Sequence, residues 1–552
     1  MVVELLNKAH INNRKTFVMH SIYKQYFSAI LQLGVVSMVI FGCQKSKDKF
    51  PDPYAGGKQP LGILMSTDAP TPQSGDIGST VTFKATGLMP YKDSLHFYIN
   101  NEPCQIVSID SSSIKIQIPS TASTGVASLT IGDQIFFGPV FKVQGKLAID
   151  PNFKATVGAD RGISDFLQLS DGRIILVGSF SDFNHLGTVK PINRIVQISK
   201  DGDVIRTIKT GIGADGNLDA IGQLPDGRIA LAGSFSSFDT HIGQINNITL
   251  LNQDGSLDTT EVRTFSDIDT IPAFNGGTDG YISHLFVTGS QITAVGSFRY
   301  YMQKVYNHSD YLGVRDSLIT DSVQVKNVIR FFSDGSLDSS FNYNFYQHKS
   351  KEGTNGPVND AYMQPDGKLI MVGNFTQYDG EDVNYVVRLN PDGSIDRSFK
   401  TGSGADNPVS SIRYNKNSHR FVLAGSFNHF NGEPHYGLVL LNDDGSIDES
   451  FKPSPMGSGI DSYTYAQQLS NGLILVNGYF KTYDGIQRGN FMVLDPSGVL
   501  ASGYNTTGNF DGRVYNGLET TNSNNQITVM LIGNFDKFDE QTMGNITRVI
   551  LK

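Results

Sequence analysis

Short apolar runs separated by turn signals dominate the chain from residue 61 to its end. A typical stretch is Leu224–Gly233, LPDGRIALAG, in which an Asp-Gly turn joins two apolar runs as in a β-hairpin. The stretch Ile248–Asp258, ITLLNQDGSLD, adds a third run, another Asp-Gly turn and a short fourth run. We therefore predict an all-β protein built largely from four-stranded antiparallel units.

One tripeptide, Gly-x-Phe after an apolar run, recurs seven times. Its glycines are Gly178, Gly233, Gly296, Gly373, Gly425, Gly478 and Gly533, spaced by 55, 63, 77, 52, 53 and 55 residues. Three residues after each Phe comes a second aromatic: Phe183, Phe238, Tyr301, Tyr378, Phe430, Tyr483 and Phe538. Seven such units predict a seven-bladed β-propeller over residues 146–552. We expect each glycine where neighbouring backbone comes close. We expect the aromatic pairs to fill the space between blades; the alternative is a repeated ligand platform.

The order of these signals also resembles a known repeat. One unit reads NPDGSIDRSFKTGSGADNPVSSI and another QPDGKLIMVGNF. This pattern is similar to the bacterial delta-60 repeat family of predicted propellers, over about 400 residues. The resemblance implies a propeller and carries no established chemistry.

The last unit ends at Lys552, directly after its third apolar run, so its fourth strand is missing. Residues 147–153, LAIDPNF, match the fourth-strand segment Ser394–Phe399. The match places Ile149, Asp150 and Phe153 over Ile395, Asp396 and Phe399. We predict that this N-terminal strand completes the last blade and so removes the open sheet edges.

Residues 61–145 have a different pattern and predict a separate β-sandwich. Its strand-like runs are Val81–Ala85, Leu95–Ile99, Ile114–Ile118, Ala127–Ile131 and Val140–Val143. The segment resembles an immunoglobulin-like IPT/TIG domain, which implies a spacer or interaction role. Cys104 lies in a strand-like segment and is expected to be a buried apolar residue. With Cys43 the only other cysteine, no disulfide framework is expected.

The first 42 residues read as an export signal, with Met19 as an alternative start. Phe27–Gly42 is apolar and free of charge, and it stops at Cys43. The sequence Ile40-Phe41-Gly42-Cys43 resembles the lipobox of bacterial lipoproteins, which implies cleavage before Cys43, lipidation of its sulfur and an outer-membrane location. The alternative is a transmembrane anchor, but 16 residues fall short of the roughly 20 that span a bilayer. Residues 43–60 predict a tether.

Charge and motifs exclude several function classes. The net charge is -9 and no basic run follows the first fifty residues, so no nucleic-acid partner is expected. The turn Asn442–Gly445 with Asp448 superficially resembles a calcium loop but lacks the distal bidentate acid, and a plain hairpin turn is the better interpretation. Nucleophile elbows, zinc-type spacings and phosphate-binding Gly loops are missing from the sequence, and we expect no metal or cofactor.

A polar position recurs inside the first apolar run of the units. Its residues are Asp165, His284, Asp360, Ser411, Tyr465 and Asn516, and the second unit has Ala220 beside Asp219. First strands commonly line a propeller's central channel, so we predict that these side chains line it. A hydrated channel wall is the favoured interpretation, and an active site is the alternative.

The third unit breaks the repeat with the insertion Arg299–Val323. Its candidate ligand-binding residues are Tyr300, Tyr301, Tyr306, His308 and Tyr311. A second tyrosine-rich loop, Asn342–Gly356, follows. Exposed Tyr, Asn and His suit a sugar or protein surface; the alternative is a loop that packs only on itself.

Together these features predict a non-catalytic envelope lipoprotein that binds a glycan or a partner protein. The combination is similar to accessory lipoproteins that Gram-negative bacteria pair with polysaccharide-uptake systems. The lack of Trp weighs against a glycan. The alternative is a propeller enzyme (a lyase, lactonase or glycosidase) acting at the central channel, in which acids or His would meet in one pocket.

Overall fold

The computed structural model describes residues 60–187, 192–455, 461–522 and 524–552. Within these ranges the chain is all-β, with one 3-10 turn at Met89–Tyr91 and no α-helix. No helix in the described part is both long and apolar enough to cross a membrane. The export signal, Cys43 and nearly all of the predicted tether lie outside the described residues.

The N-terminal β-sandwich confirms the predicted immunoglobulin-like fold. Its strands are β1 (Leu64–Met65), β2 (Ser74–Asp76), β3 (Thr80–Thr86), β4 (Leu95–Ile99), β5 (Glu102–Ile109), β6 (Ser113–Gln117), β7 (Gly125–Ile131) and β8 (Gln134–Gln144), in the order β1-β3-β6-β5-β4-β7-β8-β2. The Phe83 ring on β3 lies 4.9 Å from that of Phe97 on β4 and 5.8 Å from that of Phe141 on β8. These rings fill the space between the two layers. Cys104 on β5 is half-buried and not fully buried as predicted, and desolvation raises the pKa of its thiol to about 12.

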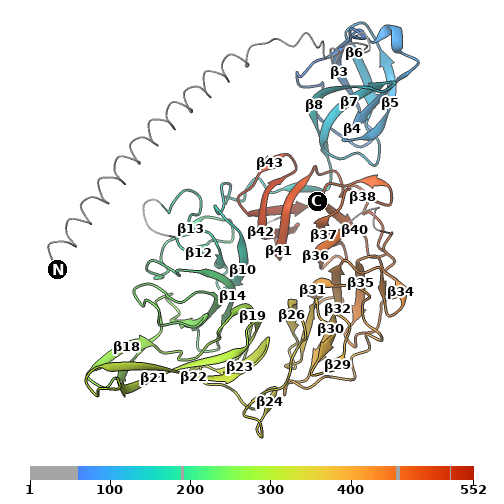
Figure 1. The fold of residues 1–552 in the computed structure, drawn as a ribbon. Coiled ribbons are helices and arrows are strands. Elements are labelled where there is room, and N and C mark those ends of the chain that lie inside the picture. The colour runs from blue at the N-terminus through green and yellow to red at the C-terminus, as the bar shows by residue number, and fades with distance from the viewer. Residues whose placement is uncertain (1–59, 188–191, 456–460, 523) are drawn as a thin grey trace, which may run out of the picture. The chain divides into compact units, whose positions relative to one another are not determined.

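Seven antiparallel blades follow, as predicted (Figure 1). Their first three strands are β10 (Ile163–Gln168), β11 (Ile174–Gly178) and β12 (Ile195–Ile198) in blade 1; β14 (Asn217–Gln223), β15 (Ile229–Ser234) and β16 (Ile248–Leu251) in blade 2; β19 (Tyr281–Thr288), β20 (Gln291–Ser297) and β23 (Val328–Phe332) in blade 3; β26 (Val358–Met363), β27 (Leu369–Gly373) and β30 (Val386–Leu389) in blade 4; β31 (Val409–Asn415), β32 (Arg420–Gly425) and β35 (Leu438–Asn442) in blade 5; β36 (Ser462–Gln468), β37 (Ile474–Tyr479) and β40 (Phe491–Leu494) in blade 6; and β41 (Phe510–Thr521), β42 (Ile527–Phe538) and β44 (Ile546–Leu551) in blade 7. The fourth strand is β13 (Val204–Ile205) in blade 1 and β9 (Leu147–Ile149) in blade 7. In blades 2 to 6 it shrinks to a single β-bridge, such as Leu389 with Ile395.

The hydrophobic core of the ring lies between the blades. It divides into seven clusters, and each joins two neighbouring blades. Phe427 and Phe430 of blade 5, for example, pack in one cluster with Ile370 and Val372 of blade 4. All fourteen aromatics of the Gly-x-Phe repeat are at most 4% exposed. They fill the space between blades, so the alternative of a repeated ligand platform is wrong.

The repeated glycine has a specific cause, a β-bulge in the first strand of every blade. In blade 5, Val409 pairs with Gly425 and Ser411 pairs with Ala424, so Ser410 is an extra residue. The same shift occurs opposite the glycine in the other six blades. A Cβ on Gly425 would lie 2.5 Å from the carbonyl oxygen of Pro408. The bulge needs a residue without a side chain opposite it.

The ring closes through β9, as predicted. Its residues Leu147, Ala148 and Ile149 pair with β44 of the last blade. Asp150 accepts a hydrogen bond from the Arg548 Nε at 2.8 Å, and the Arg548 guanidinium lies 4.9 Å from the Phe153 ring centre. Blade 4 shows the same arrangement within one continuous segment. There Arg388 donates to Asp396 at 2.8 Å and lies 4.3 Å from the Phe399 ring centre.

A further inter-blade link, made by asparagine, was not predicted. Asn247, Asn327, Asn490 and Asn545 precede the third strand of their blades, all with positive φ, a conformation that Asn tolerates better than most residues. Each donates its side-chain amide to a main-chain carbonyl of the next blade. Asn545 reaches Ala159 at 2.9 Å and so ties the last blade to the first.

Three insertions leave the ring at one end of its strands. In blade 3 the short hairpin between the second and third strands is extended into β21 (Tyr300–Ser309) and β22 (Asp316–Gln324). A second hairpin, β17 (Thr259–Arg263) with β18 (Ile268–Pro272), joins blades 2 and 3. A third, β24 (Tyr343–Asn344) with β25 (Lys349–Ser350), joins blades 3 and 4. Because antiparallel strands alternate in direction, these connections share one face of the propeller.

Candidate functional site

The first strands of the blades surround a central cavity, called here the channel, of about 750 Å³. Five of the six predicted channel residues line it: Asp165, His284, Asp360, Ser411 and Asn516. Each lies directly after the extra residue of its bulge, so the bulge sets the direction of the side chain. The extra residues of these blades line the channel too, and in blade 2 only the extra residue, Asp219, does so, because its neighbour Ala220 is buried.

Tyr465 does not belong to this set, and its assignment to the channel wall is corrected. It is 1% exposed and packs in the cluster between blades 6 and 7. The Tyr465 hydroxyl donates to Gln467 Oε1 at 2.5 Å, and the Arg413 guanidinium lies 5.3 Å from the ring centre. A large aromatic ring at this position is buried behind the wall, and Thr464 and Gln467 line the channel instead.

One side of the channel holds a network of polar side chains around Asp360. The Asp360 carboxylate lies 3.2 Å from His284 Nε2, pairs with the Arg413 guanidinium and accepts the Ile412 main-chain N–H at 2.9 Å. His284 Nδ1 lies 2.9 Å from the Ser283 hydroxyl. Burial would raise the pKa of Asp360, but the nearby Arg413 and His284 outweigh burial and lower it. Asp360 is therefore an ionised, fully paired group.

The other side of the channel holds two carboxyl groups for which burial outweighs their hydrogen bonds and the charge of His284. Asp165 accepts hydrogen bonds from Asn516 Nδ2 at 3.2 Å and from the Ile221 N–H at 3.3 Å. Asp219 accepts one from the Ser164 hydroxyl at 3.3 Å. Burial raises the pKa of both, and neither forms an ion pair within the described part of the chain.

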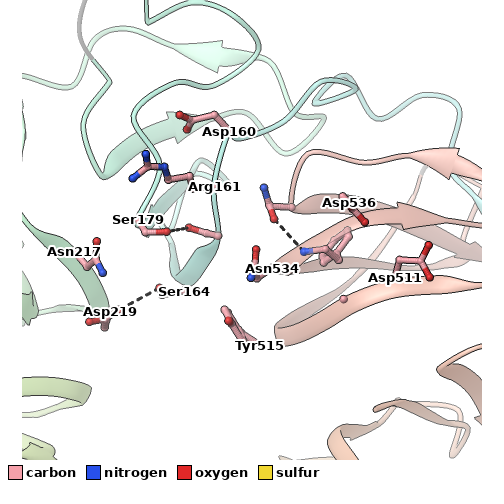
Figure 2. Close-up of a pocket in the computed structure, with 14 residues that line it drawn as sticks. Asp160, Arg161, Ser164, Ser179, Asn217, Asp219, Asp511, Tyr515, Asn534 and Asp536 are labelled. Atoms are coloured by element: carbon pink, nitrogen blue, oxygen red, sulfur yellow. Dashed lines mark hydrogen bonds between the residues drawn. The ribbon is translucent and has the colours of Figure 1, made fainter. Parts of the chain in front are cut away.

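The channel opens into a second pocket of about 790 Å³, called here the mouth. Ser164, Asp219 and Tyr515 line both, so the two spaces adjoin each other. Figure 2 shows Asn217 and Asp219 on one side of the mouth and Asn534 and Tyr515 on the other. The lining is rich in polar groups that could bind a ligand.

Asp160, also at the mouth, has a structural role. It accepts the main-chain N–H groups of Ser181 at 2.8 Å and Asp182 at 3.0 Å. Blades 2, 3, 4 and 5 repeat this contact through Asp215, Asp279, Asn355 and Asp406. These side chains hold the turn after each Gly-x-Phe and do not mark a site.

The three hairpins form the main exposed apolar surface, called here the hairpin platform (β17–β18, β21–β22 and β24–β25). Ten of the twenty-four exposed large hydrophobic side chains in the described part lie on these three hairpins and their turns. Tyr311 is 95% exposed and Tyr346 is 100% exposed. Their neighbours include Leu312, Val314, Leu318 and Phe345. Exposed apolar side chains gathered in this way are typical of an interaction surface.

The predicted ligand residues of the insertion fall into three groups. Tyr300, His308 and Tyr311 are exposed. Tyr306 is half-buried in a cleft of about 460 Å³ between β17–β18 and β21–β22, and burial raises its pKa. Tyr301 is 4% exposed and donates its hydroxyl to the Gly335 carbonyl at 3.1 Å. Its assignment as a ligand residue is wrong, because it is the second aromatic of its blade and packs between blades.

Sequence reasoning missed the hairpin β17–β18 and the channel groups Arg413 and Arg513, and in blade 2 it aligned Ala220 with the polar position that Asp219 fills. The 63-residue spacing after Gly233, against 52 to 55 for most units, was a signal of the hairpin. Arg413 lies three residues past the extra residue Ser410 in blade 5, and Arg513 lies two residues before the extra residue Tyr515 in blade 7, where the sequence gives no such signal. No group of three or more His, Cys, Asp or Glu residues suited to a metal ion occurs among the described residues.

Two family models match parts of the chain. Residues 42–139 match a domain of unknown function (DUF5008). Residues 224–260, 314–341, 364–399 and 420–451 match a β-propeller domain of unknown function (DUF5122). No curated protein matches the chain.

Several solved structures match the chain at low identity and low TM-score. A structural genomics protein of unknown function from Bacteroides thetaiotaomicron is 11% identical, with 90% of this chain and 98% of that chain covered and a TM-score of 0.24. An auxiliary nutrient binding protein from Bacteroides ovatus is 11% identical, with 65% and 94% covered and a TM-score of 0.20. PorZ, a surface component of the type-IX secretion system of Porphyromonas gingivalis, is 10% identical, with 78% and 51% covered and a TM-score of 0.30. At these TM-scores the likenesses carry no argument about function.

Proposed function

We propose that the protein is a lipid-anchored binding module of the bacterial outer envelope, and that the hairpin platform of its propeller binds a partner protein. The observation that carries this proposal is the concentration of exposed Tyr, Leu, Ile, Val and Phe side chains on three insertions of one face. Aromatic side chains surrounded by aliphatic ones favour a protein partner over a glycan, because protein interfaces have apolar centres.

The platform is held in place before any partner binds. The Lys304 ammonium on β21 donates to the Gly243 carbonyl of blade 2 at 2.8 Å. The Asn275 side chain bonds the main chain of Lys304, with distances of 2.8 and 3.1 Å. Ser266, in the β17–β18 turn, donates its N–H to Asp316 at 2.9 Å. A pre-ordered surface loses less conformational entropy on binding than a disordered loop does.

The alternative of an enzyme in the channel has one supporting feature, the Ser283–His284–Asp360 array. The polar groups of this array, however, already have hydrogen-bond and ion-pair partners in the channel wall. The Ser283 hydroxyl also lies 3.2 Å from the Val295 carbonyl, and Asp360 is shared with Arg413 and the Ile412 N–H. Such an array orients the inner strands of neighbouring blades, and a binding module remains the better interpretation.

The lipid anchor is tested at Cys43. Substituting Cys43→Ala should remove the acylated thiol and leave the protein unprocessed or released from the membrane fraction, since one substitution takes away the modified atom. Fractionation of cells and intact-protein mass spectrometry measure both effects. A variant that fractionates and migrates like the wild type would show that Cys43 carries no anchor.

The platform is tested by substituting Tyr300→Ala, Tyr311→Ala and Tyr346→Ala together. These side chains are exposed, so thermal unfolding should change little, whereas retention of partner proteins in a pull-down from detergent-solubilised envelopes should be lost. The contrasting substitution is Tyr301→Ala, which should cost about 3–5 kcal/mol of unfolding free energy because its ring is buried. A stable triple variant that retains every wild-type partner would move the binding surface elsewhere.

A further inference from the structure

The channel and its mouth form a second site, distinct from the hairpin platform and unassigned by the proposed function. Its wall holds the carboxyl groups of Asp165, Asp219 and Asp360, and the mouth adds those of Asp511 and Asp536. The cations of the channel wall are Arg413 and Arg513, with His284 as a third basic group. Arg161 adds a cation at the mouth.

The direct ion pairs of the channel wall are all made by one carboxylate, that of Asp360. Arg413 and His284 both face Asp360, and Arg413 also donates to the Tyr515 carbonyl at 2.6 Å. The Arg513 guanidinium lies 5.7 Å from the Tyr515 ring centre. Asp165 and Asp219 accept hydrogen bonds from neutral donors only, and the charge of His284 acts on both from beyond ion-pair distance. This arc of the wall therefore has two carboxyl groups and no paired cation among the described residues.

A separate observation is that several buried polar groups of the channel wall have no hydrogen-bond partner. Ser411 is 3% exposed and lines the channel, yet its hydroxyl makes no hydrogen bond within the described structure. The Nε atoms of Arg413 and Arg513, also in the channel wall, have none either. Buried polar groups are usually hydrogen-bonded, and unsatisfied ones indicate that a ligand or water completes the site.

We propose that the channel binds a small molecule that carries a protonated amine beside hydroxyl groups, with Asp165 and Asp219 receiving the ammonium and Ser411 a hydroxyl. A bound ammonium group supplies the ion-pair partner that these two carboxyl groups do not have within the described residues. It also offsets the burial that raises the pKa of both, since a neighbouring positive charge favours the ionised carboxylate. Neutral sugars of the same shape lack this interaction.

The test uses the full chain released from its anchor, titrated by calorimetry at pH 7.5 with glucosamine, glucose and spermidine. Glucosamine and spermidine should bind saturably, and glucose at least tenfold more weakly than glucosamine. The Asp165→Asn, Asp219→Asn double variant, which keeps shape and hydrogen-bonding atoms, should weaken amine binding at least tenfold. Glu433→Gln makes the same kind of charge change on the exposed hairpin of blade 5 and should leave binding unchanged.

Thermal unfolding of the double variant confirms that it is folded before binding is compared. If neither amine binds saturably, or if glucose binds as well as glucosamine, the proposal is overturned and water fills the channel. Equal loss in the Glu433→Gln variant would show only a general charge effect and would also overturn it. The Tyr300, Tyr311 and Tyr346 triple variant should bind the amines like the wild type, which separates this site from the platform.

Discussion

An Asp150→Ala variant is expected to lose about 3 kcal/mol of unfolding free energy, because removing one half of a buried ion pair leaves the Arg548 guanidinium with only the half-exposed Asp201 at 3.3 Å as a charge partner. The Asp150 side chain is 2% exposed and that of its partner Arg548 is 9% exposed. This pair joins β9, more than three hundred residues away in sequence, to the last blade. The loss should therefore reach the whole ring, with faster amide exchange in β44 and in the neighbouring strands of blade 1.

Chemical denaturation followed by fluorescence measures the change. The control is Asp203→Ala in blade 1, which removes an exposed partner of Lys154 and should cost at most about 1 kcal/mol. If the two variants unfold alike, β9 contributes nothing to closing the ring, and the C-terminal blade is stable with three strands.

The second large effect is expected at the bulge glycines. A Cβ at Gly533 would lie 2.0 Å from the Arg513 carbonyl oxygen, a main-chain atom that cannot rotate away. Gly533→Ala should destabilise the protein by about 1–3 kcal/mol, the usual cost of forcing extra volume into a packed interior. Thermal unfolding and denaturant midpoints measure the effect.

Gly162→Ala is the matched control. Gly162 lies in blade 1, facing Gly533 of blade 7. A Cβ on Gly162 would come no closer than 3.5 Å to any atom, which is an ordinary contact. Its effect should be small, or slightly stabilising through the unfolded chain. Equal losses at the two positions would mean that glycine is needed for flexibility and not for the bulge.

The fold could be predicted because its signals are local and repeated. The spacing of Gly-x-Phe sets the number of blades, and the match of Ile149, Asp150 and Phe153 to a fourth strand identifies the closing segment. Each signal depends on the contacts of one blade with the next, so seven copies reinforce one interpretation. The asparagine links were missed because a single Asn before a strand is common in ordinary turns.

The site was harder to predict because side-chain direction depends on the bulge. One extra residue turns Asp219 toward the channel and leaves Ala220 buried, and it places Tyr465 behind the wall. The alternation of residues along a strand predicts which face of the sheet each side chain lies on only when the strand has no bulge. Tyr301 and Tyr300 are neighbours in sequence, but the first belongs to the blade repeat and the second to the platform.

The most direct test of the binding account is site-specific photo-cross-linking in intact cells. A photoreactive amino acid replaces Tyr311 at the tip of the platform. A second variant carries it at Lys416, an exposed residue in the turn between the first and second strands of blade 5, at the opposite end of the strands. A discrete cross-linked protein is expected from position 311 and not from position 416. Equal patterns from both positions, or no adduct from 311, would contradict the proposal that the platform binds a partner protein.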